Sequence, residues 1–118
     1  MIKIVEILSY KLKNGFGEEF YRVMREDSLP LHKQFKIDVV YHGPSLNDQD
    51  NYLLIRCYDS ENQMNELLEN FYQSHEWKLG PREKIITAID ISLKTLLELP
   101  APAVDALRGA GTPSILSN

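Results

Sequence analysis

The most constraining feature of this 118-residue chain is its first strand-like segment, Ile2 to Leu12, with the sequence IKIVEILSYKL. Apolar residues fall on both of its parities, with Ile4 and Leu8 on one and Val5 on the other. Successive strand side chains point to opposite faces of a sheet, so this strand must be buried on both faces. The chain's own helices can cover one face, and we expect a different layer over the other.

Composition and charge limit the classes of protein that this chain can belong to. With 43% hydrophobic and 25% charged residues, it matches an ordinary globular domain. The net charge of −4 argues against nucleic-acid or anionic-membrane partners, since either needs a basic face. No apolar stretch approaches the roughly 20 residues that cross a bilayer, and no signal-peptide pattern is visible. Cys57 is the single cysteine, so we expect a cytoplasmic protein without a disulfide framework.

Two helical regions are predicted between the strand-like segments. The first begins near Glu18, and Pro30 interrupts it, so we expect a kink or restart near Ser28. The second begins with a capping box at Ser60 and Gln63. It continues with amphipathic spacing through Met64, Leu67, Leu68 and Phe71. Ser74 can cap a short extra turn that Gly80 closes, and residues 82–86 can form another.

Further strands are predicted at residues 37–42, 52–58 and 88–99, which gives the order β-α-β-β-α-β. This is the ferredoxin-like split βαβ order, an antiparallel sheet with two helices on one face. A bare apolar face on such a sheet would aggregate, whereas two sheets facing each other in a symmetric dimer remove the problem. We therefore predict an α+β, ferredoxin-like βαββαβ sandwich that forms a dimeric α/β barrel.

The barrel domain is predicted to span residues 1–99. Beyond Pro100 the composition shifts to Ala, Pro, Gly and Ser. We expect residues 100–118 to be a peripheral C-terminal tail with weak structure of its own, packed on a neighbouring subunit.

Several stretches of this sequence are similar to those of one protein family. VEILSYKLKNG (residues 5–15), the Leu29-Pro30 pair, and the segments YLLIRCYDSENQ and FYQSHEWKLGP carry the likeness. On these, residues 1–99 resemble the NIPSNAP-type members of the dimeric α/β-barrel superfamily. The resemblance implies a homodimeric barrel of undefined biochemical role. Related branches include small monooxygenases that act on quinols, polyketides or haem, but no catalytic motif carries over from them residue by residue.

The best candidate site combines two strands that are neighbours in a ferredoxin-like sheet. Glu6 and Tyr10 share a parity on the first strand, and Arg56 and Tyr58 share one on the third. As a site, Arg56 would bind a carboxylate or enolate while the tyrosines contact an aromatic molecule. The structural alternative is a buried Glu6–Arg56 ion pair inside the dimer core, capped by the tyrosines.

His32 is the most interesting of the three histidines, because it follows the interruption at Pro30. It could act as a base or an axial haem ligand above the sheet. The alternative is a histidine on the wet side of its helix. His42 is expected at a strand end or interface, and His75 in solvent. Their spacing, without HxH or HxxxH, disfavours a metal site.

A second group lies around the turn after the second helix. Trp77 and Arg82 could form a pocket lid and an anion anchor, together with Phe71 and Tyr72. Alternatively, Trp77 fills the gap between helix and sheet. Asp90, Ser92 and Lys94 share a parity of the last strand and are expected to form a solvated stripe on an edge strand. Cys57 is expected to be a buried, unreactive thiol.

The leading hypothesis is a homodimer that binds a small aromatic or acidic organic molecule between sheet and helices. The ligand-binding candidates are Glu6, Tyr10, His32, Arg56, Tyr58, Trp77 and Arg82, and the catalytic candidates are His32, Tyr10 and Arg56. No cofactor motif is present: the chain lacks a glycine-rich phosphate loop and a GxSxG sequence. The alternatives are a small monooxygenase of the same superfamily and a purely structural or interaction protein.

Overall fold

The computed structural model of the chain describes residues 1–111, with side chains described up to Arg108. Its strands are β1 (Ile2–Leu12), β2 (Asp38–Pro44), β3 (Asn51–Tyr58) and β4 (Ile89–Pro100). Its helices are α1 (Gly17–Val23), the π-helical turn η1 (Met24–Ser28), α2 (Leu29–Gln34), α3 (Glu61–Gln73), α4 (His75–Leu79), α5 (Arg82–Ala88) and α6 (Ala101–Gly111). The predicted α+β fold and order of strands are confirmed.

The four strands form one antiparallel sheet in the order β2-β3-β1-β4. Strands β1 and β3 are neighbours, with Glu6 opposite Arg56 and Tyr10 opposite Tyr52. Strand β4 is an edge strand, as expected, and its side chains are largely exposed. The sheet therefore brings the predicted site residues of β1 and β3 together on adjacent strands.

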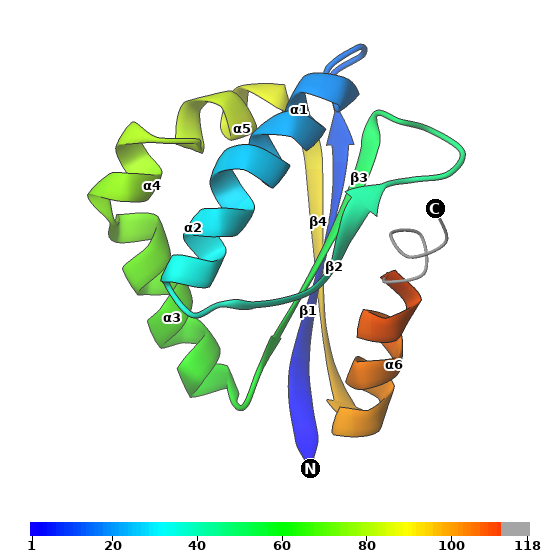
Figure 1. The fold of residues 1–118 in the computed structure, drawn as a ribbon, viewed down its shortest axis with the longest axis vertical. Helices are drawn as coiled ribbons and strands as arrows, with labels where there is room; N and C mark the ends of the chain where they lie inside the picture. Colours follow the sequence, from blue (N-terminus) through cyan, green and yellow to red (C-terminus); the bar gives the residue numbers. More distant parts are fainter. Residues whose placement is uncertain (112–118) are drawn as a thin grey trace.

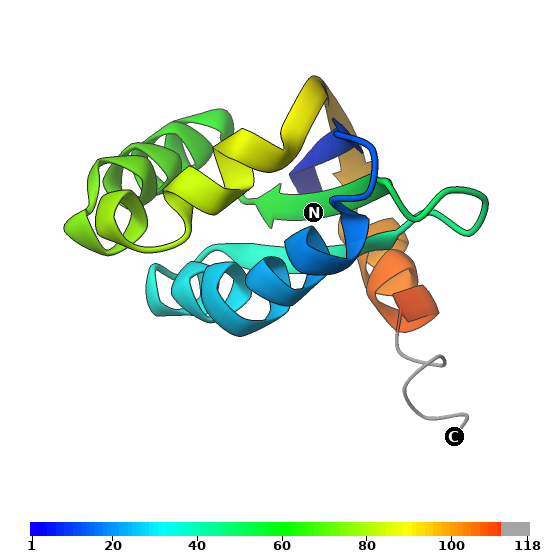
Figure 2. The ribbon, with the colours of Figure 1, turned by 90° about the horizontal axis from the view of Figure 1, so that it is seen from above.

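The two sides of the sheet are covered differently. Helices α1 to α5 lie on one side, called here the helix side, and α6 lies on the other, called the α6 side (Figures 1 and 2). Ile4, Leu8 and Leu12 of β1 belong to the core on the helix side. Val5 belongs to a smaller cluster with Val104 of α6. Both parities of β1 include buried residues, but on the α6 side only Val5 is buried, so the predicted burial of both faces holds in part.

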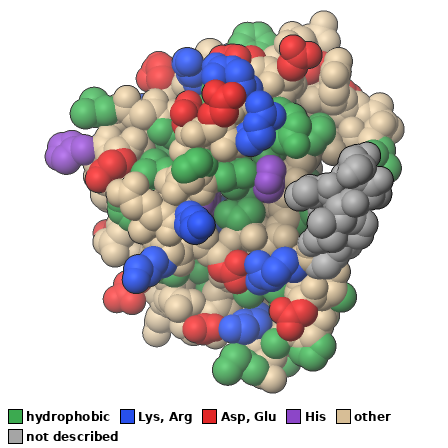
Figure 3. Space-filling view, in the orientation of Figure 1, with side chains coloured by type: hydrophobic (Ala, Val, Ile, Leu, Met, Phe, Trp, Pro, Cys, Tyr) green, Lys and Arg blue, Asp and Glu red, His purple; other side chains and the backbone are tan. Residues whose placement is uncertain are grey.

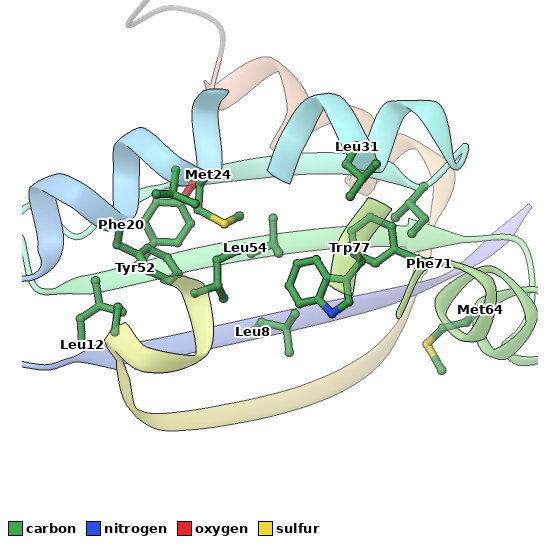
Figure 4. Close-up of a cluster of buried hydrophobic side chains, with 14 of the residues drawn as sticks. Leu8, Leu12, Phe20, Met24, Leu31, Tyr52, Leu54, Met64, Phe71 and Trp77 are labelled. Carbon is green, nitrogen blue, oxygen red and sulfur yellow. The ribbon is translucent and has the colours of Figure 1, made fainter. Parts of the chain in front are cut away.

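The main core lies between the sheet and helices α1 to α5 (Figure 4). Phe20 and Met24 contribute from the first helical layer, and Phe71 and Trp77 from α3 and α4. Phe71 is fully buried and makes an edge-on ring contact with Phe35, with centroids 5.7 Å apart. Trp77 is buried in this core, between helix and sheet.

Pro30 shapes the first helical region. Its ring would clash with the carbonyl four residues earlier, and it has no N–H to donate. The chain responds with the π-helical turn η1 at Met24–Ser28 and resumes as α2 at Leu29. The predicted restart near Ser28 is confirmed. Such a turn adds a residue to the helix and therefore changes which side chains face the sheet.

The predicted caps of the second helical region are present. The Ser60 hydroxyl accepts a hydrogen bond from the Gln63 backbone N–H at 3.0 Å, and the Gln63 side chain accepts from the Asp59 N–H at 2.6 Å. The Ser74 hydroxyl accepts from the Trp77 N–H at 3.1 Å and so begins α4. These caps fix the position of α4, and with it the indole of Trp77.

Residues 101–111 differ from the sequence-based expectation of weak structure. They form α6, whose Val104 is buried on the chain's own sheet against β1 and β2 residues. Arg108 of this helix forms a two-pronged ion pair with Asp38 of β2, at 2.8 and 2.9 Å. The rest of the predicted tail, residues 112–118, lies outside the described residues. Among the helices of residues 1–111, none has the length and apolar character that a membrane span requires.

Candidate functional site

A buried ion pair lies at the centre of the candidate site. Glu6 and Arg56 face each other across β1 and β3, and only 1% and 2% of their surfaces are exposed. Arg56 Nε donates to Glu6 Oε1 at 2.6 Å, and the Tyr58 hydroxyl donates to the same oxygen at 2.8 Å. The pair lies on the helix side of the sheet, among side chains of helices α2 and α3. The interpretation of an ion pair between two facing sheets is therefore wrong about the face.

His32 of α2 completes this group from the helix side of the sheet. It is 2% exposed, so the interpretation of a histidine on the wet side of the helix is wrong. Nδ1–H donates to the Ser28 carbonyl at 2.7 Å, and Nε2 accepts from Arg56 Nη1 at 3.0 Å. The same Nη1 donates to the Tyr72 hydroxyl at 3.0 Å. We name Glu6, His32, Arg56, Tyr58 and Tyr72 the Arg56 cluster.

The environment of His32 keeps its ring neutral. Burial and the neighbouring Arg56 guanidinium lower its pKa to about 4. Both ring nitrogens already have partners, one as a donor and one as an acceptor. His32 therefore has no lone pair available to bind a haem iron or to take a substrate proton, and its role as an axial ligand is not supported by this geometry.

Glu6 stays ionised despite its burial. Burial by itself would raise its pKa, but hydrogen bonds from Arg56, Tyr58 and Lys94 lower it overall. Lys94 Nζ of β4 lies 3.2 Å from Glu6 Oε2, and this lysine side chain is half exposed. Because His32 is neutral, the carboxylate of Glu6 is the single negative charge that the two cations Arg56 and Lys94 share. Arg56, Lys94 and Glu6 together therefore carry a net charge of about +1.

Several hydrogen-bond donors of the group have no acceptor among the described residues. Arg56 uses Nε and Nη1 but not Nη2. The Tyr10 hydroxyl and the Trp77 indole N–H also lack partners in residues 1–108. Every fully buried polar side-chain atom of this part of the chain does have a partner. These three donors therefore each keep some accessible surface.

The Arg56 guanidinium lies beside aromatic rings. Arg56 lies over the Tyr72 ring, with 5.8 Å between Cζ and the ring centroid, and the centroids of Tyr72 and Trp77 are 5.1 Å apart. Burial raises the pKa of Tyr10, whose phenol is also influenced by Tyr72 and Arg56. Guanidinium and aromatic rings suit a planar molecule that carries an acidic group.

The structure places the remaining candidates elsewhere. Arg82 is exposed on α5, 3.9 Å from Glu83, and is not part of the Arg56 cluster. His42 Nδ1 hydrogen-bonds with the Tyr52 hydroxyl at 2.8 Å, and His75 is exposed. Cys57 is buried, and burial raises the pKa of its thiol. No group of three or more metal-ligating side chains forms within the described residues.

Two contributors were not among the predicted site residues. Lys94 was assigned to a solvated stripe, and only the β1–β4 register brings it to Glu6. Tyr72 was considered only as part of a lid. Its position four residues after Leu68 on an amphipathic helix was the available signal. Five surface hollows of the described chain are lined by residues outside the Arg56 cluster, whose side chains are packed against one another.

Together, the sheet order, the helices on one side and the buried cluster define an α+β protein of the ferredoxin-like class. No protein-family model matches the sequence, and neither does any curated protein. Solved structures do. A NIPSNAP family protein of unknown function from Agrobacterium tumefaciens superposes with a TM-score of 0.76 at 18% identity, over 82% of this chain and 87% of that one.

Other solved structures share the fold. An uncharacterized NIPSNAP domain protein from Burkholderia xenovorans gives a TM-score of 0.73 at 15% identity, over 82% of this chain and 93% of that one. A candidate antibiotic biosynthesis monooxygenase from Nitrosomonas europaea gives 0.62 at 13% identity, over 80% and 95%. The resemblance to NIPSNAP-type proteins predicted from the sequence is thus confirmed at the level of the fold.

Proposed function

We propose that this protein is a homodimer that binds a small aromatic or acidic organic anion at the Arg56 cluster, between sheet and helices. The observation that carries the proposal is that two cations, buried Arg56 and half-exposed Lys94, share the single carboxylate of Glu6, beside unused donors at Arg56 Nη2 and Tyr10. A carboxylate or enolate would balance that charge and accept those hydrogen bonds. The side chain of Lys94 is half exposed, so its ammonium can reach an incoming anion as well as Glu6.

The apolar surface on the α6 side of the sheet supports the homodimer. Leu97 lies opposite Val5, and Leu93 lies opposite Ser9, so both leucines face this side. They are 40% and 64% exposed, because α6 covers the neighbouring part of the sheet and leaves β4 open. A second copy placed by a twofold axis would cover each sheet with the other. The lone, buried Cys57 fits a cytoplasmic location for this dimer.

Ligand binding is tested by titrating benzoate, an aromatic carboxylate, into the protein and into Lys94→Met. We expect saturable binding to the natural chain, and about tenfold weaker binding to the variant, which loses the excess charge. Lys13→Met, a substitution of an exposed lysine after β1, should bind like the natural protein. Isothermal titration calorimetry measures all three. Equal affinity for all three proteins would place benzoate elsewhere.

The dimer is tested by sedimentation at micromolar concentration. We expect twice the mass of the 13.6 kDa chain, and a single-chain mass for Leu93→Glu, because the carboxylate would be buried between the sheets. The matched control is Leu79→Glu, which alters an equally apolar and 85% exposed residue on α4, and it should remain a dimer. A single-chain mass for the unmodified protein would contradict the proposal.

Two other functions give different results in these experiments. A structural or interaction protein with a filled core would dimerise but bind no aromatic acid. A cofactor-independent monooxygenase would bind the acid and also oxidise an activated aromatic substrate in air. The similarity of fold to the monooxygenase from Nitrosomonas europaea favours this second candidate, and consumption of oxygen would identify it.

A further inference from the structure

A hollow between α2 and β2 lies apart from the Arg56 cluster. Its volume is about 480 Å³, and its lining combines an apolar base with polar side chains. The apolar residues are Leu29, Ile37 and Val39, and the nitrogen-bearing residues are Lys33, Lys36 and His42. Figure 3 shows this face of the molecule, with hydrophobic side chains beside a histidine near its middle and Lys and Arg side chains around them.

The charge of this hollow is positive, although the whole chain is negative. Lys33 and Lys36 are exposed, and no carboxylate of the described residues pairs with either. Asp38, which also lines the hollow, is engaged by Arg108 through both of its oxygens. Two ammonium groups therefore remain available to an anion in a protein of net charge −4.

Lys36 also has an unusual backbone conformation. Its φ is 62°, the only positive value of a non-glycine residue in residues 1–111. It ends α2, where the Lys36 N–H bonds to the Lys33 carbonyl and the Ile37 N–H bonds to the His32 carbonyl. Glycine or asparagine usually occupies this left-handed position, because other side chains are strained there. A lysine at this place puts an ammonium at the rim of the hollow.

His42 supplies a further donor. Its Nδ1 pairs with the Tyr52 hydroxyl, which has no other partner in the described chain. When the Tyr52 hydroxyl donates to Nδ1, the proton of the neutral His42 ring is on Nε2. Nε2 has no acceptor among residues 1–108, and burial keeps the pKa of the ring below its ordinary value. The neutral ring can therefore donate one hydrogen bond to a bound acceptor.

We infer that this hollow binds an organic monoanion with a short apolar body, such as a medium-chain carboxylate. The carboxylate lies between the ammonium groups of Lys33 and Lys36, and the apolar body covers Leu29, Ile37 and Val39. This site is separate from the Arg56 cluster, since Glu6 and Arg56 do not line the hollow. It therefore does not depend on the function proposed above.

The test uses octanoate as the probe, with the full-length chain and calorimetric titration. Lys36→Asn removes the ammonium but tolerates the left-handed backbone, and Lys36→Arg keeps the charge. We expect saturable octanoate binding by the natural chain and by Lys36→Arg, and about tenfold weaker binding by Lys36→Asn. Lys36→Asn should also melt at an equal or higher temperature, which excludes unfolding as the cause.

Two further probes separate charge from apolar contact. We expect 1-octanol, without the charge, and inorganic phosphate, without the apolar body, to bind at least about tenfold more weakly than octanoate. Equal binding of either probe would overturn the inference, as would unchanged octanoate binding by Lys36→Asn. Octanoate binding that is lost in Lys94→Met but kept in Lys36→Asn would also overturn it, because it would assign octanoate to the Arg56 cluster.

Discussion

Arg56→Met is expected to lower the free energy of unfolding by about 3–5 kcal/mol, because it leaves the Glu6 carboxylate buried without its main partner. The double variant Glu6→Leu/Arg56→Met should recover most of this loss, since buried ion pairs replaced by apolar side chains of similar volume are often neutral. Urea denaturation, with the slope checked for constancy, measures both effects.

The matched control is Arg22→Met. Arg22 also contacts two carboxylates, those of Glu19 and Glu26, but in an exposed position on α1. Water screens exposed ion pairs, so this change should have only a small effect on the free energy of unfolding. If Arg56→Met cost no more than Arg22→Met, the Glu6–Arg56 pair would not be as desolvated as the structure indicates.

A second large effect is expected when the pH is lowered. The pKa of His32 is about 4 in the folded protein and about 6.5 in the unfolded chain. Between these values the unfolded state binds a proton that the folded state does not, so stability is complete above about pH 6.5 and falls as the pH drops toward 4. The full loss from this residue is about 3 kcal/mol. Urea denaturation from pH 7 to 4.5 measures most of it.

Two variants separate His32 from the other titrating groups. His32→Gln should remove most of the pH dependence between 4.5 and 7 and leave a smaller part from His42, whose pKa burial also lowers, whereas His75→Gln, a change at an exposed ring, should leave it intact. The series stops at pH 4.5 to exclude Glu6. Its pKa is lowered in the folded protein, so the stability that its ionised form contributes is lost mainly at more acidic pH. An unchanged slope in His32→Gln would mean that the ring is not held neutral by burial and Arg56.

The order of strands and the pairing of Glu6 with Arg56 could be predicted from the sequence. The parity of each strand is visible in the pattern, and the ferredoxin-like order makes β1 and β3 neighbours. The side of the sheet on which Glu6 and Arg56 lie could not be predicted. Val5 and Leu8 point to opposite sides and both are apolar, so the sequence does not show which side the helices cover. Only the positions of the helices, which depend on tertiary packing, decide that Glu6 lies on the helix side.

The burial of His32 was hidden by a local irregularity. Helical periodicity assumes about 100° of rotation per residue, and the π-helical turn at Met24–Ser28 adds a residue before Pro30. A helical pattern counted from Phe20 with regular spacing therefore assigns His32 to the wrong face of the helix. Lys94 was missed for a similar reason, since its contact with Glu6 depends on the register between two long strands.

The α6 helix could not be predicted from composition, because the residues after Pro100 are rich in Ala, Pro, Gly and Ser. Residues 101–108, APAVDALR, adjoin a stretch rich in proline and glycine and resemble it in composition. The segment nevertheless places Val104 and Leu107 one helical turn apart, and both pack against the α6 side of the sheet. The helix covers only part of that side, so the apolar β4 surface that motivates a dimer remains.

The most direct test of the Arg56 cluster as a binding site is the NMR signal of the Arg56 side-chain Nε–H during a titration with benzoate. If the anion binds at this guanidinium, the Arg56 signal and the Trp77 indole N–H signal will move together and saturate at one benzoate per chain. If both signals stay in place while benzoate reaches millimolar concentration, the buried charge serves packing alone, and the proposed site is wrong.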